Sequence, residues 1–495
     1  MLNHPPALVS NLYTKRLSCA ARQHMFFLLD FAQGCAKPSA ATVLGRSRCL
    51  CGDGASSRLS PCGDGASPRP GRAQLAFLPF CNPERGVEAY GLHISHYSVA
   101  NFYIFPLAIS FPMGGEKLVI RPRPAFLLPL AVVLFLPLSA QSQHWPEARA
   151  NAWYQQQPWL VGSNFIPDDA INELEMWQAA TFNPREIDTE LGWAEGLGMN
   201  TMRVFLHDLL WQQDAAGFKR RINSFLEIAA RHHIRPIFVL FDSCWDPDPK
   251  LGPQHPPIPG VHNSGWVQSP GAAALQDPPQ YPRLQAYVQG VIGAFANDSR
   301  VLAWDLWNEP DNTNGGSYSR FEPKNKVALV LALLPQVYVW ARAAHPSQPL
   351  TSGVWHGDWS ADDRLSPMER IQVQESDILS FHNYSWPEDF EKHVRWLQRY
   401  HRPIICTEFM ARPMGSTFDT VLPIAKQYHV AAINWGLVAG KTQTYLPWDS
   451  WQRPYVLEPP PVWFHEVFHP DGKPYREEEA RIIRQLTRKA ATPRQ

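Results

Sequence analysis

The sequence predicts an α/β fold in which eight parallel strands and the helices between them form a (β/α)8 TIM barrel. Eight short apolar runs alternate with segments of helical spacing between residues 159 and 437. Strands that alternate with helices indicate a parallel sheet with helices packed on it. Polar residues gather at the carboxyl ends of these runs. A barrel brings all of those ends to one face, whereas an open sheet would spread them along an edge.

The elements follow one another in a regular order along the chain. We expect strands at 159–166, 201–206, 235–242, 301–309, 350–355, 378–384, 403–409 and 431–437. We expect helices at 187–197, 218–232, 284–296, 326–344, 390–400 and 418–428, and a last one within 463–486. No Gly-x-Gly-x-x-Gly or Gly-Lys-Ser/Thr loop follows a strand, which counts against a nucleotide-binding open sheet.

The fourth strand has the most informative end. Its apolar run starts at Val301 and ends in Asn308, Glu309 and Pro310. Proline cannot donate to a sheet ladder, so the strand must stop at Glu309. For Asn308 and Glu309 both to face one cleft, the strict alternation of side chains must fail there, and we expect a β-bulge.

Composition separates the chain into two unlike parts. The 495 residues carry no net charge, so nothing in the charge favours a nucleic acid or an anionic membrane as partner. All 19 tryptophans lie between Trp145 and Trp463. Residues 1–112 hold six of the eight cysteines, without the spacing of a paired Cys-x-x-Cys metal site. We expect 1–112 to be a mis-assigned, disordered upstream extension. Abundant peptides from it in the native protein would contradict this.

Residues 113–142 have the order of a secretory signal peptide. Basic residues after Met113 precede an apolar core at 125–138, and small residues follow at 139–142. A membrane anchor is the alternative, but the core is shorter than the roughly 20 residues needed and contains two prolines. We therefore expect export to the extracellular space or the periplasm from a start near Met113. No membrane association is expected after cleavage.

Two strand-end carboxyl groups indicate glycoside hydrolysis. Glu309 ends the fourth strand and Glu408 the seventh, so the two can face each other across the barrel mouth. This reaction needs one protonated and one ionised carboxyl group, roughly 5–5.5 Å apart in retaining enzymes. The simpler interpretation is that each glutamate pairs with an arginine or caps a helix.

Neighbouring strand ends supply supporting residues. Arg203 could hold a carboxylate ionised, or form a structural ion pair with Asp242 or Asp305. Asn308 could bind a sugar hydroxyl. His382 and Tyr384 are two apart and point the same way. We expect Tyr384 to touch one carboxylate and His382 the substrate.

Aromatic residues are frequent in the loops of the same face. Trp435, at the end of the eighth strand, could be the floor for a sugar ring or part of the barrel core. Flat rings suit the apolar faces of sugars, and about half of the loop aromatics should bind substrate, the rest packing within loops. The candidates for substrate contact are Trp245, Trp355, Trp386 and Trp448, and further loop aromatics are Trp266, Trp359, Tyr445 and Trp451.

Four motifs together resemble those of the family 5 glycoside hydrolases of clan A, the cellulase- and mannanase-like glycosidases. They are Trp304-Asp-Leu-Trp-Asn-Glu-Pro310, His382-x-Tyr384, Thr407-Glu408-Phe409 and Trp435. The resemblance covers about residues 145–490 and implies a retaining mechanism, with Glu309 as acid/base and Glu408 as nucleophile. It implies active-site roles for Arg203, Asn308, His382, Tyr384 and Trp435. Many members place a histidine after the third strand, where this chain has Asp242-Ser-Cys-Trp245.

We therefore expect residues 143–490 to be a monomeric glycoside hydrolase domain. Its substrate would be a β-linked poly- or oligosaccharide of mannan, xylan or glucan type, cleaved without a metal or cofactor. One alternative is exo action on short oligosaccharides, and another is a carbohydrate-binding barrel without activity. A metal-dependent barrel hydrolase is disfavoured because no His-x-His motif ends a strand.

Overall fold

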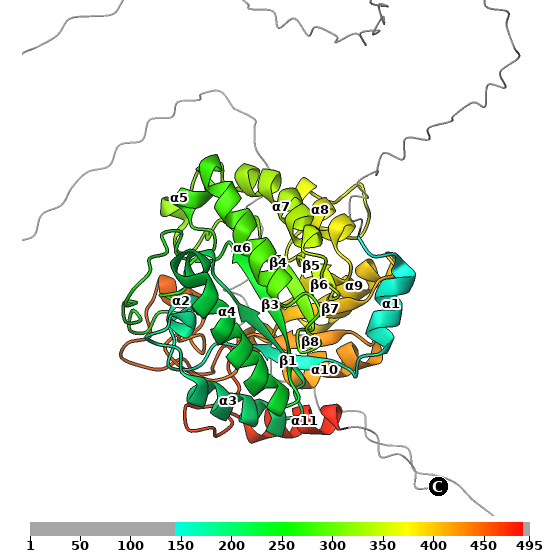
Figure 1. The fold of residues 1–495 in the computed structure, drawn as a ribbon. Coiled ribbons are helices and arrows are strands. Elements are labelled where there is room, and N and C mark those ends of the chain that lie inside the picture. The colour runs from blue at the N-terminus through cyan, green and yellow to red at the C-terminus, as the bar shows by residue number, and fades with distance from the viewer. Residues whose placement is uncertain (1–143, 489–495) are drawn as a thin grey trace, which may run out of the picture. The chain divides into compact units, whose positions relative to one another are not determined.

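The structure, a computed structural model, describes residues 144–488. The expected upstream extension at 1–112 and signal peptide at 113–142 lie outside these residues. The described part is an eight-stranded parallel barrel surrounded by helices (Figure 1). The TIM barrel expected from the sequence is therefore confirmed.

Each of the eight expected strands is present, most of them shorter than the apolar run that predicted them. The strands are β1 (Val161–Asn164), β2 (Thr201–Phe205), β3 (Arg235–Asp242), β4 (Ala303–Asn308), β5 (Leu350–Thr351), β6 (Leu379–His382), β7 (Ile404–Phe409) and β8 (Ala431–Asn434). They are hydrogen-bonded in the order β5-β4-β3-β2-β1-β8-β7-β6. A parallel bridge between Val354, which follows β5 by three residues, and Phe381 of β6 closes the ring.

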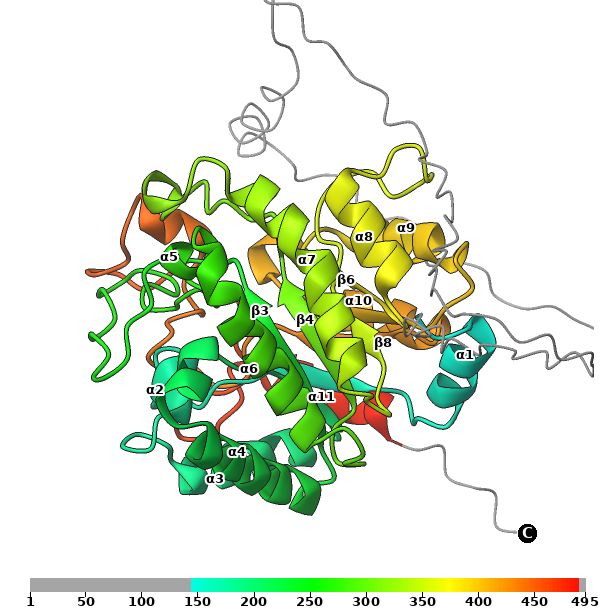
Figure 2. The ribbon, with the colours of Figure 1, turned by 45° about the horizontal axis from the view of Figure 1, so that its top comes forward.

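Helices connect the strands and pack on the outside of the barrel. They are α1 (Glu147–Gln155), α2 (Glu173–Trp177), α3 (Pro184–Gly196), α4 (Asp208–Arg231), α5 (Ala272–Leu275), α6 (Tyr281–Ala294), α7 (Lys326–Ala343), α8 (Pro367–Glu375), α9 (Pro387–Gln398), α10 (Phe418–Gln427) and α11 (Glu477–Thr487). Four short 3-10 helices are η1 (Pro278–Gln280), η2 (Ser319–Phe321), η3 (Arg412–Met414) and η4 (Trp448–Trp451). Figure 2 shows α6 and α7 lying across β3 and β4.

One of these helices, α7, is long and apolar enough to cross a membrane by length and composition, but half of that window is buried. It packs against β4, α6 and α8 as a covering helix of the barrel. Its hydrophobicity is thus explained by its position in the core.

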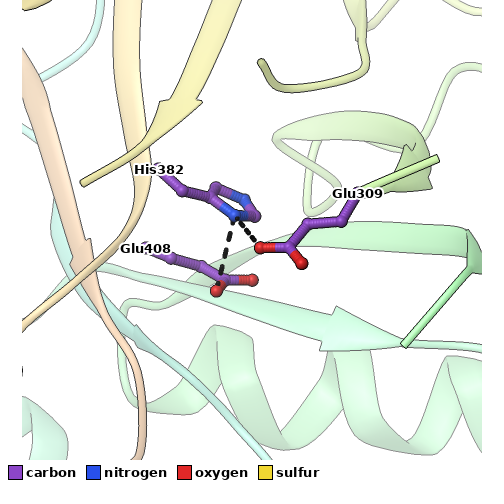
Figure 3. A group of neighbouring side chains, drawn as sticks. All are labelled: Glu309, His382 and Glu408. Carbon is purple, nitrogen blue, oxygen red and sulfur yellow. Dashed lines mark hydrogen bonds and ion pairs between the residues drawn. The ribbon is translucent and has the colours of Figure 1, made fainter. Parts of the chain in front are cut away.

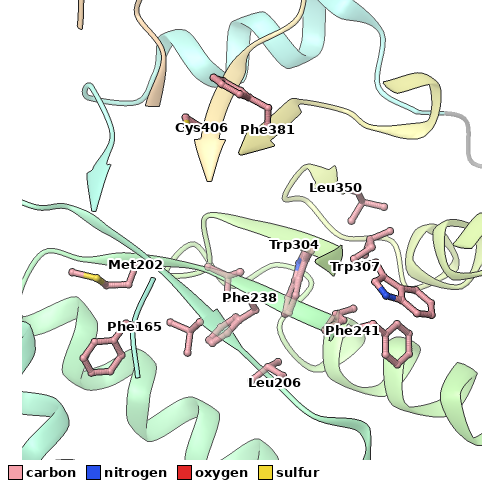
Figure 4. Packing of buried hydrophobic residues seen from close by; sticks show 14 of the residues in the cluster. Phe165, Met202, Leu206, Phe238, Phe241, Trp304, Trp307, Leu350, Phe381 and Cys406 are labelled. Atoms are coloured by element: carbon pink, nitrogen blue, oxygen red, sulfur yellow. The ribbon is translucent and has the colours of Figure 1, made fainter. Parts of the chain in front are cut away.

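Large aromatic side chains fill the layer between strands and helices (Figure 4). Phe238 packs on Trp304 with ring centroids 5.7 Å apart, and Phe241 packs on Trp307 at 5.0 Å. All four are almost fully buried. Each such ring removes roughly 150–250 Å² from water, so this layer is the main hydrophobic contribution to stability.

The amino-terminal end of the barrel is closed by α1. Trp145 and Tyr154, just before and within this helix, pack on aliphatic residues from the starts of several strands. The Tyr154 hydroxyl donates to the carbonyl of His429 at 3.0 Å. With this end plugged, the carboxyl-terminal face is left for a ligand site.

The bulge expected in β4 is absent, and that prediction is wrong. β3 and β4 keep one register through Asp242 and Asn308. Instead, Glu309 has a left-handed backbone with φ of 40°, which turns its side chain without inserting a residue. A register irregularity does occur in β7, between Cys406 and Phe409, around Glu408. The alternation of side chains between the two faces of the strand is therefore broken at both glutamates, by a left-handed residue at Glu309 and by a register shift around Glu408.

Candidate active site

The strand ends bring most of the predicted site residues together. Arg203 comes from β2, Asn308 ends β4, and Glu309 follows it. His382 ends β6, Glu408 lies in β7, and Tyr384 and Trp435 follow β6 and β8. These residues come from five elements that are far apart in sequence, and the closed barrel places their side chains on one face.

A buried arginine connects these strand ends. The Arg203 side chain has no solvent exposure. Its guanidinium donates to Asn164 (2.9 Å), Asp305 (3.0 Å), Asn308 (2.7 Å) and Glu408 (2.8 Å). Both interpretations made from the sequence therefore hold in part, because Arg203 pairs with Asp305 and also with Glu408. The charge of Glu408 is compensated at close range.

Glu408 is bonded through both carboxyl oxygens. Oε1 accepts from Arg203 at 2.8 Å, and Oε2 accepts from the Tyr384 hydroxyl at 2.7 Å. Tyr384 thus lies where the sequence placed it, against a carboxylate. Two donors on the ionised form fix the orientation of Glu408.

Glu309 has a different set of partners. Its Oε1 is 2.8 Å from Nδ1 of His382, and its Oε2 accepts from Asn312 at 2.7 Å. Cys244 Sγ lies 3.3 Å from the same Oε2. Figure 3 shows the His382 ring between the two glutamates, with its Nδ1 3.5 Å from Glu408. His382 therefore contacts the carboxyl pair, and the structure does not show it in the pocket where the sequence suggested a substrate contact.

The two carboxyl groups are close to each other. An oxygen of Glu309 and an oxygen of Glu408 lie within 4.8 Å. Carboxyl groups about 5–5.5 Å apart are typical of retaining glycosidases, and larger gaps of about 6.5–9.5 Å leave room for a water in inverting ones. The distance between the Glu309 and Glu408 oxygens is therefore in the range of retaining glycosidases.

Burial disfavours the charged forms of Glu309, Glu408 and His382. It raises the pKa of Glu309, against the hydrogen bonds from Asn312 and Cys244. It also raises the pKa of Glu408, opposed by the positive charge of Arg203 and by the hydrogen bond from Tyr384. Burial lowers the pKa of His382 to about 4, so this ring is neutral at neutral pH. Arg203 is then the permanent cation beside the pair, and it bonds directly to Glu408.

A pocket of about 300 Å³ opens over the carboxyl pair. Its walls are strongly aromatic. The lining residues are Cys244, Trp245, His262, Asn263, Asn308, Glu309, Asn312, Asn314, Gly315, Gly316, Ser317, Trp355, Tyr384, Glu408, Trp435, Trp448, Trp451 and His465. Four of the five predicted substrate-binding tryptophans are among them. The fifth, Trp386, is 65% exposed outside the pocket, and its ring lies against Gly415.

Sequence reasoning missed several residues of this pocket. Cys244 contacts Asn308 and Asn312 as well as Glu309, and it lies two residues after the end of β3. Asn312 could have been found, because it follows Glu309 by three residues. His465 and Asn263 come from long loops whose course no local pattern predicts.

Comparison with known families shows what the sequence around this site is similar to. Residues 258–451 match the family model described as Cellulase (glycosyl hydrolase family 5), a range that includes both glutamates, His382 and Trp435. This part of the barrel is thus similar to glycosyl hydrolase family 5, which bears out the resemblance expected from the sequence motifs. The protein is therefore a glycosidase that hydrolyses O-glycosyl bonds, as expected. No curated protein sequence matches the chain.

Solved structures with a similar fold include enzymes acting on mannose-containing glycans. The β-1,4-mannanase of the sea hare Aplysia kurodai is 18% identical, with a TM-score of 0.41, over 57% of this chain and 88% of its own. The exo-β-1,4-mannosidase of Opitutaceae bacterium strain TAV5 is 18% identical, with a TM-score of 0.44, over 66% and 59%. The endo-β-1,4-mannanase of Thermotoga petrophila is 12% identical, with a TM-score of 0.42, over 68% and 77%.

The carboxyl site also meets a geometric condition for a metal ion. Glu309, His382 and Glu408 each offer a ligand atom within 4.8 Å of the others. However, the guanidinium of Arg203 already compensates Glu408, and Tyr384 occupies its other oxygen. A divalent ion would be repelled by that fixed cation at close range. The donor set therefore suits a pair of carboxyl groups better than a metal, and the expectation of no metal stays a prediction.

The Arg203 network makes a prediction about stability. Replacing Arg203 with alanine leaves Asp305 and Glu408 buried without their cation, and we expect the free energy of unfolding to fall by ~3–5 kcal/mol. Urea denaturation followed by fluorescence measures this. Arg231→Ala, which breaks an exposed pair with Asp188, is the control and should change little. Equal stability of the two variants would contradict a central role for Arg203.

Proposed function

We propose that the protein is a retaining glycosidase that cleaves a β-linked poly- or oligosaccharide of mannan, xylan or glucan type by double displacement. The observation that carries this proposal is the pair Glu309 and Glu408, whose oxygens lie within 4.8 Å and whose partners differ in kind. One carboxylate is bonded to a fixed cation and the other is not. This asymmetry provides the ionised and the protonated group that the reaction needs.

In the first step, Glu408 acts as nucleophile. A carboxylate oxygen attacks the anomeric carbon, and the bond from that carbon to the leaving oxygen breaks. Glu309 gives its proton to the leaving oxygen, so the aglycone departs as a neutral alcohol and Glu309 becomes ionised. The product is a covalent glycosyl ester on Glu408.

In the second step, the roles of Glu309 reverse. Its carboxylate removes a proton from a water molecule, whose oxygen attacks the anomeric carbon and breaks the ester bond. Glu408 leaves as a carboxylate, again compensated by Arg203, and Glu309 regains its proton. Two inversions at one carbon give net retention of configuration.

The partners of each glutamate support these roles. Arg203 and Tyr384 favour the ionised form of Glu408, which a nucleophile requires. Glu309 has only neutral partners within hydrogen-bond distance, and its burial favours the protonated form. When Glu408 becomes an ester and loses its charge, the repulsion on Glu309 falls, which helps Glu309 to act as a base.

Trp435 supports sugar binding at the same site. It lines the pocket with Glu309 and Glu408, and its ring is fixed edge-on by Phe205 (5.8 Å) and Trp266 (5.8 Å). A rigid indole at the pocket floor can pack against the apolar face of a sugar ring. Trp245, Trp355 and Trp448 form walls around it.

Two variants test the assigned roles. Glu408→Gln should lower kcat/KM by roughly 10⁴-fold or more on every substrate, because the nucleophile is gone. Glu309→Gln should lower kcat/KM by roughly 10²–10⁴-fold on glycosides with poor leaving groups, because no acid protonates the leaving oxygen. It should retain the initial burst on a dinitrophenyl glycoside, whose leaving group needs no proton. Steady-state and burst kinetics on aryl manno-, xylo- and glucosides measure both effects.

The surface variant Glu391→Gln on α9 is the control for these measurements and should keep full activity. Unchanged activity of Glu408→Gln would remove the double-displacement proposal. If Glu309→Gln loses both the burst on the dinitrophenyl glycoside and kcat/KM on glycosides with poor leaving groups, the acid/base assignment is contradicted.

The pH profile gives a second test. The acidic limb of kcat/KM reports ionisation of Glu408 in the free enzyme, because only its ionised form attacks. The Tyr384 hydroxyl lowers the pKa of Glu408, so Tyr384→Phe should move this limb to higher pH. Tyr287→Phe removes a buried hydroxyl on α6 that bonds to the carbonyl of Leu240, and it should leave the limb in place. An unshifted limb in Tyr384→Phe would contradict the assignment.

A metal-dependent hydrolase is the second candidate, because the ligand atoms of Glu309, His382 and Glu408 lie within 4.8 Å. Our proposal predicts unchanged kcat and KM after dialysis against EDTA. It also predicts less than one equivalent of zinc in the purified protein by mass spectrometry. Activity that disappears with chelation and returns with added zinc would favour the metal instead.

A further inference from the structure

The loops after β3 and β8 are joined across the barrel face by backbone hydrogen bonds. Asn263 N donates to the carbonyl of Thr442 at 2.8 Å, and Tyr455 N donates to that of Gly260 at 2.9 Å. Gln443 adds side-chain bonds to the carbonyls of Ile258 (2.7 Å) and Val261 (3.1 Å). We call these two joined segments, 258–264 and 442–455, the β3–β8 bridge.

Buried side chains make the bridge rigid. His262 Nδ1 donates to the carbonyl of Leu446 at 2.7 Å, and its backbone N–H donates to Ser450 at 2.9 Å. Trp451 donates to the carbonyl of His262 at 2.8 Å and stacks on Trp245, with ring centroids 5.7 Å apart. Burial lowers the pKa of His262 to about 4, so the ring remains neutral and keeps this geometry at neutral pH.

The bridge closes the pocket on one side. The residues that line the pocket belong to the strand ends and loops of β3 to β8, and none of them comes from the segments that follow β1 or β2. Since the bridge joins the β3 and β8 loops, it separates the pocket from β1 and β2, the strands between them in the sheet. The volume of about 300 Å³ is at the low end for ligand pockets. A long chain passing through the site would need both sides open.

Asn263 belongs to the β3–β8 bridge, on the closed side of the pocket, and its side-chain amide is buried without a partner among the described residues. Its side chain has no solvent exposure, yet neither its amide nitrogen nor its amide oxygen bonds to any described residue. Its backbone is left-handed, with φ of 48°. A buried polar group without a partner is costly, and strained residues of this kind cluster at ligand sites. Asn263 lines the same pocket as the two glutamates.

A sugar hydroxyl complements this free amide. Each hydroxyl can donate to the amide oxygen and accept from the amide nitrogen, so adjacent hydroxyls of one ring can satisfy both atoms. Water could do the same without specificity, whereas a chain end offers hydroxyls in fixed positions. An internal sugar of a chain carries a glycosidic bond in place of one of them.

The position of Glu309 indicates which chain end enters. The leaving group must lie beside Glu309, whose loop continues to Asp311, and Asp311 accepts from Trp355 at 2.7 Å. Trp435 instead packs on Trp266, which follows Asn263 by three residues. The leaving group is therefore directed toward Trp355, and the attacked sugar lies between Trp435 and the bridge.

We propose that the β3–β8 bridge makes this site a closed pocket for the non-reducing terminal sugar of a β-linked chain, with Asn263 as the residue that binds its hydroxyls. The enzyme then acts from the chain end and releases one small sugar unit at each turnover. This inference rests on the proposed function and adds the mode of action to it.

The first experiment follows products from manno-, xylo- and cellohexaose labelled at the reducing end with 2-aminobenzoic acid. On the hexaose that is hydrolysed, we expect label to appear first on the product that has lost one terminal unit, and then on progressively shorter ones. Labelled mid-length products at the earliest time points would show internal cleavage and overturn the inference. Early labelled monosaccharide would overturn the assigned chain end.

The second experiment removes the amide. Asn263→Gly deletes the side chain and suits the left-handed backbone, so the fold should be kept and the melting temperature should not fall. We expect kcat/KM on the hexaose to fall roughly 10- to 100-fold, the effect of losing one or two hydrogen bonds to a substrate. His345→Gly is the matched control, because it lies at another left-handed position (φ 51°), in the turn after α7. It should keep full activity.

The outcomes separate the two proposals. Hydrolysis that is lost in Glu408→Gln but yields internal products contradicts only the closed pocket. Unchanged kcat/KM in a folded Asn263→Gly variant contradicts the role of Asn263. A hexaose that is hydrolysed equally by the wild type and by Glu408→Gln contradicts the proposed function itself.

Discussion

The guanidinium of Arg203 is the interaction on which the rest of the site depends. It has no contact with solvent, so its charge must be satisfied inside the barrel. The acceptors come from β1, β4 and β7, namely Asn164, Asp305, Asn308 and Glu408. A fixed cation bonded to strands on opposite sides of the barrel holds their carboxyl ends in place. It also determines which of the two glutamates is compensated, and therefore which one can attack.

The chemistry follows from this asymmetry and from the closed face around it. Burial raises the pKa of both glutamates, but only Glu408 is hydrogen-bonded directly to the Arg203 cation and to a tyrosine hydroxyl, which oppose the rise. Non-glycine residues with left-handed backbones occur at both ends of the barrel. Four of them, at His233, His345, His401 and His429, follow helices, whereas Trp245, Asn263, Glu309 and Met410 are among those in loops at strand ends. Such strain is tolerated where surrounding contacts determine the backbone, as the bonds of the β3–β8 bridge do.

The sequence predicted the strands and the carboxyl pair well, because both depend on local patterns. Apolar runs identify buried parallel strands, and a polar residue after such a run marks its end. The short helices α1, α2, α5 and α8 were missed, because each is too short to show a sustained helical period of apolar residues. The prediction of a bulge at Glu309 was wrong, because a residue with a left-handed backbone redirects its side chain without the extra residue that a bulge inserts. Cys244 and Asn263 could not be identified, because long loops position them through contacts with β4 and with the β8 loop.

Trapping the covalent intermediate tests the central claim most directly. A dinitrophenyl 2-deoxy-2-fluoro-β-glycoside of the hydrolysed sugar slows both steps, while its good leaving group allows the first to proceed. We predict one equivalent of dinitrophenolate and an intact-protein mass increased by one fluorosugar. Peptide sequencing by mass spectrometry should place this label on Glu408. Full hydrolytic activity on the parent sugar without any adduct, or a label on another residue, would contradict an Arg203-held Glu408 as the nucleophile.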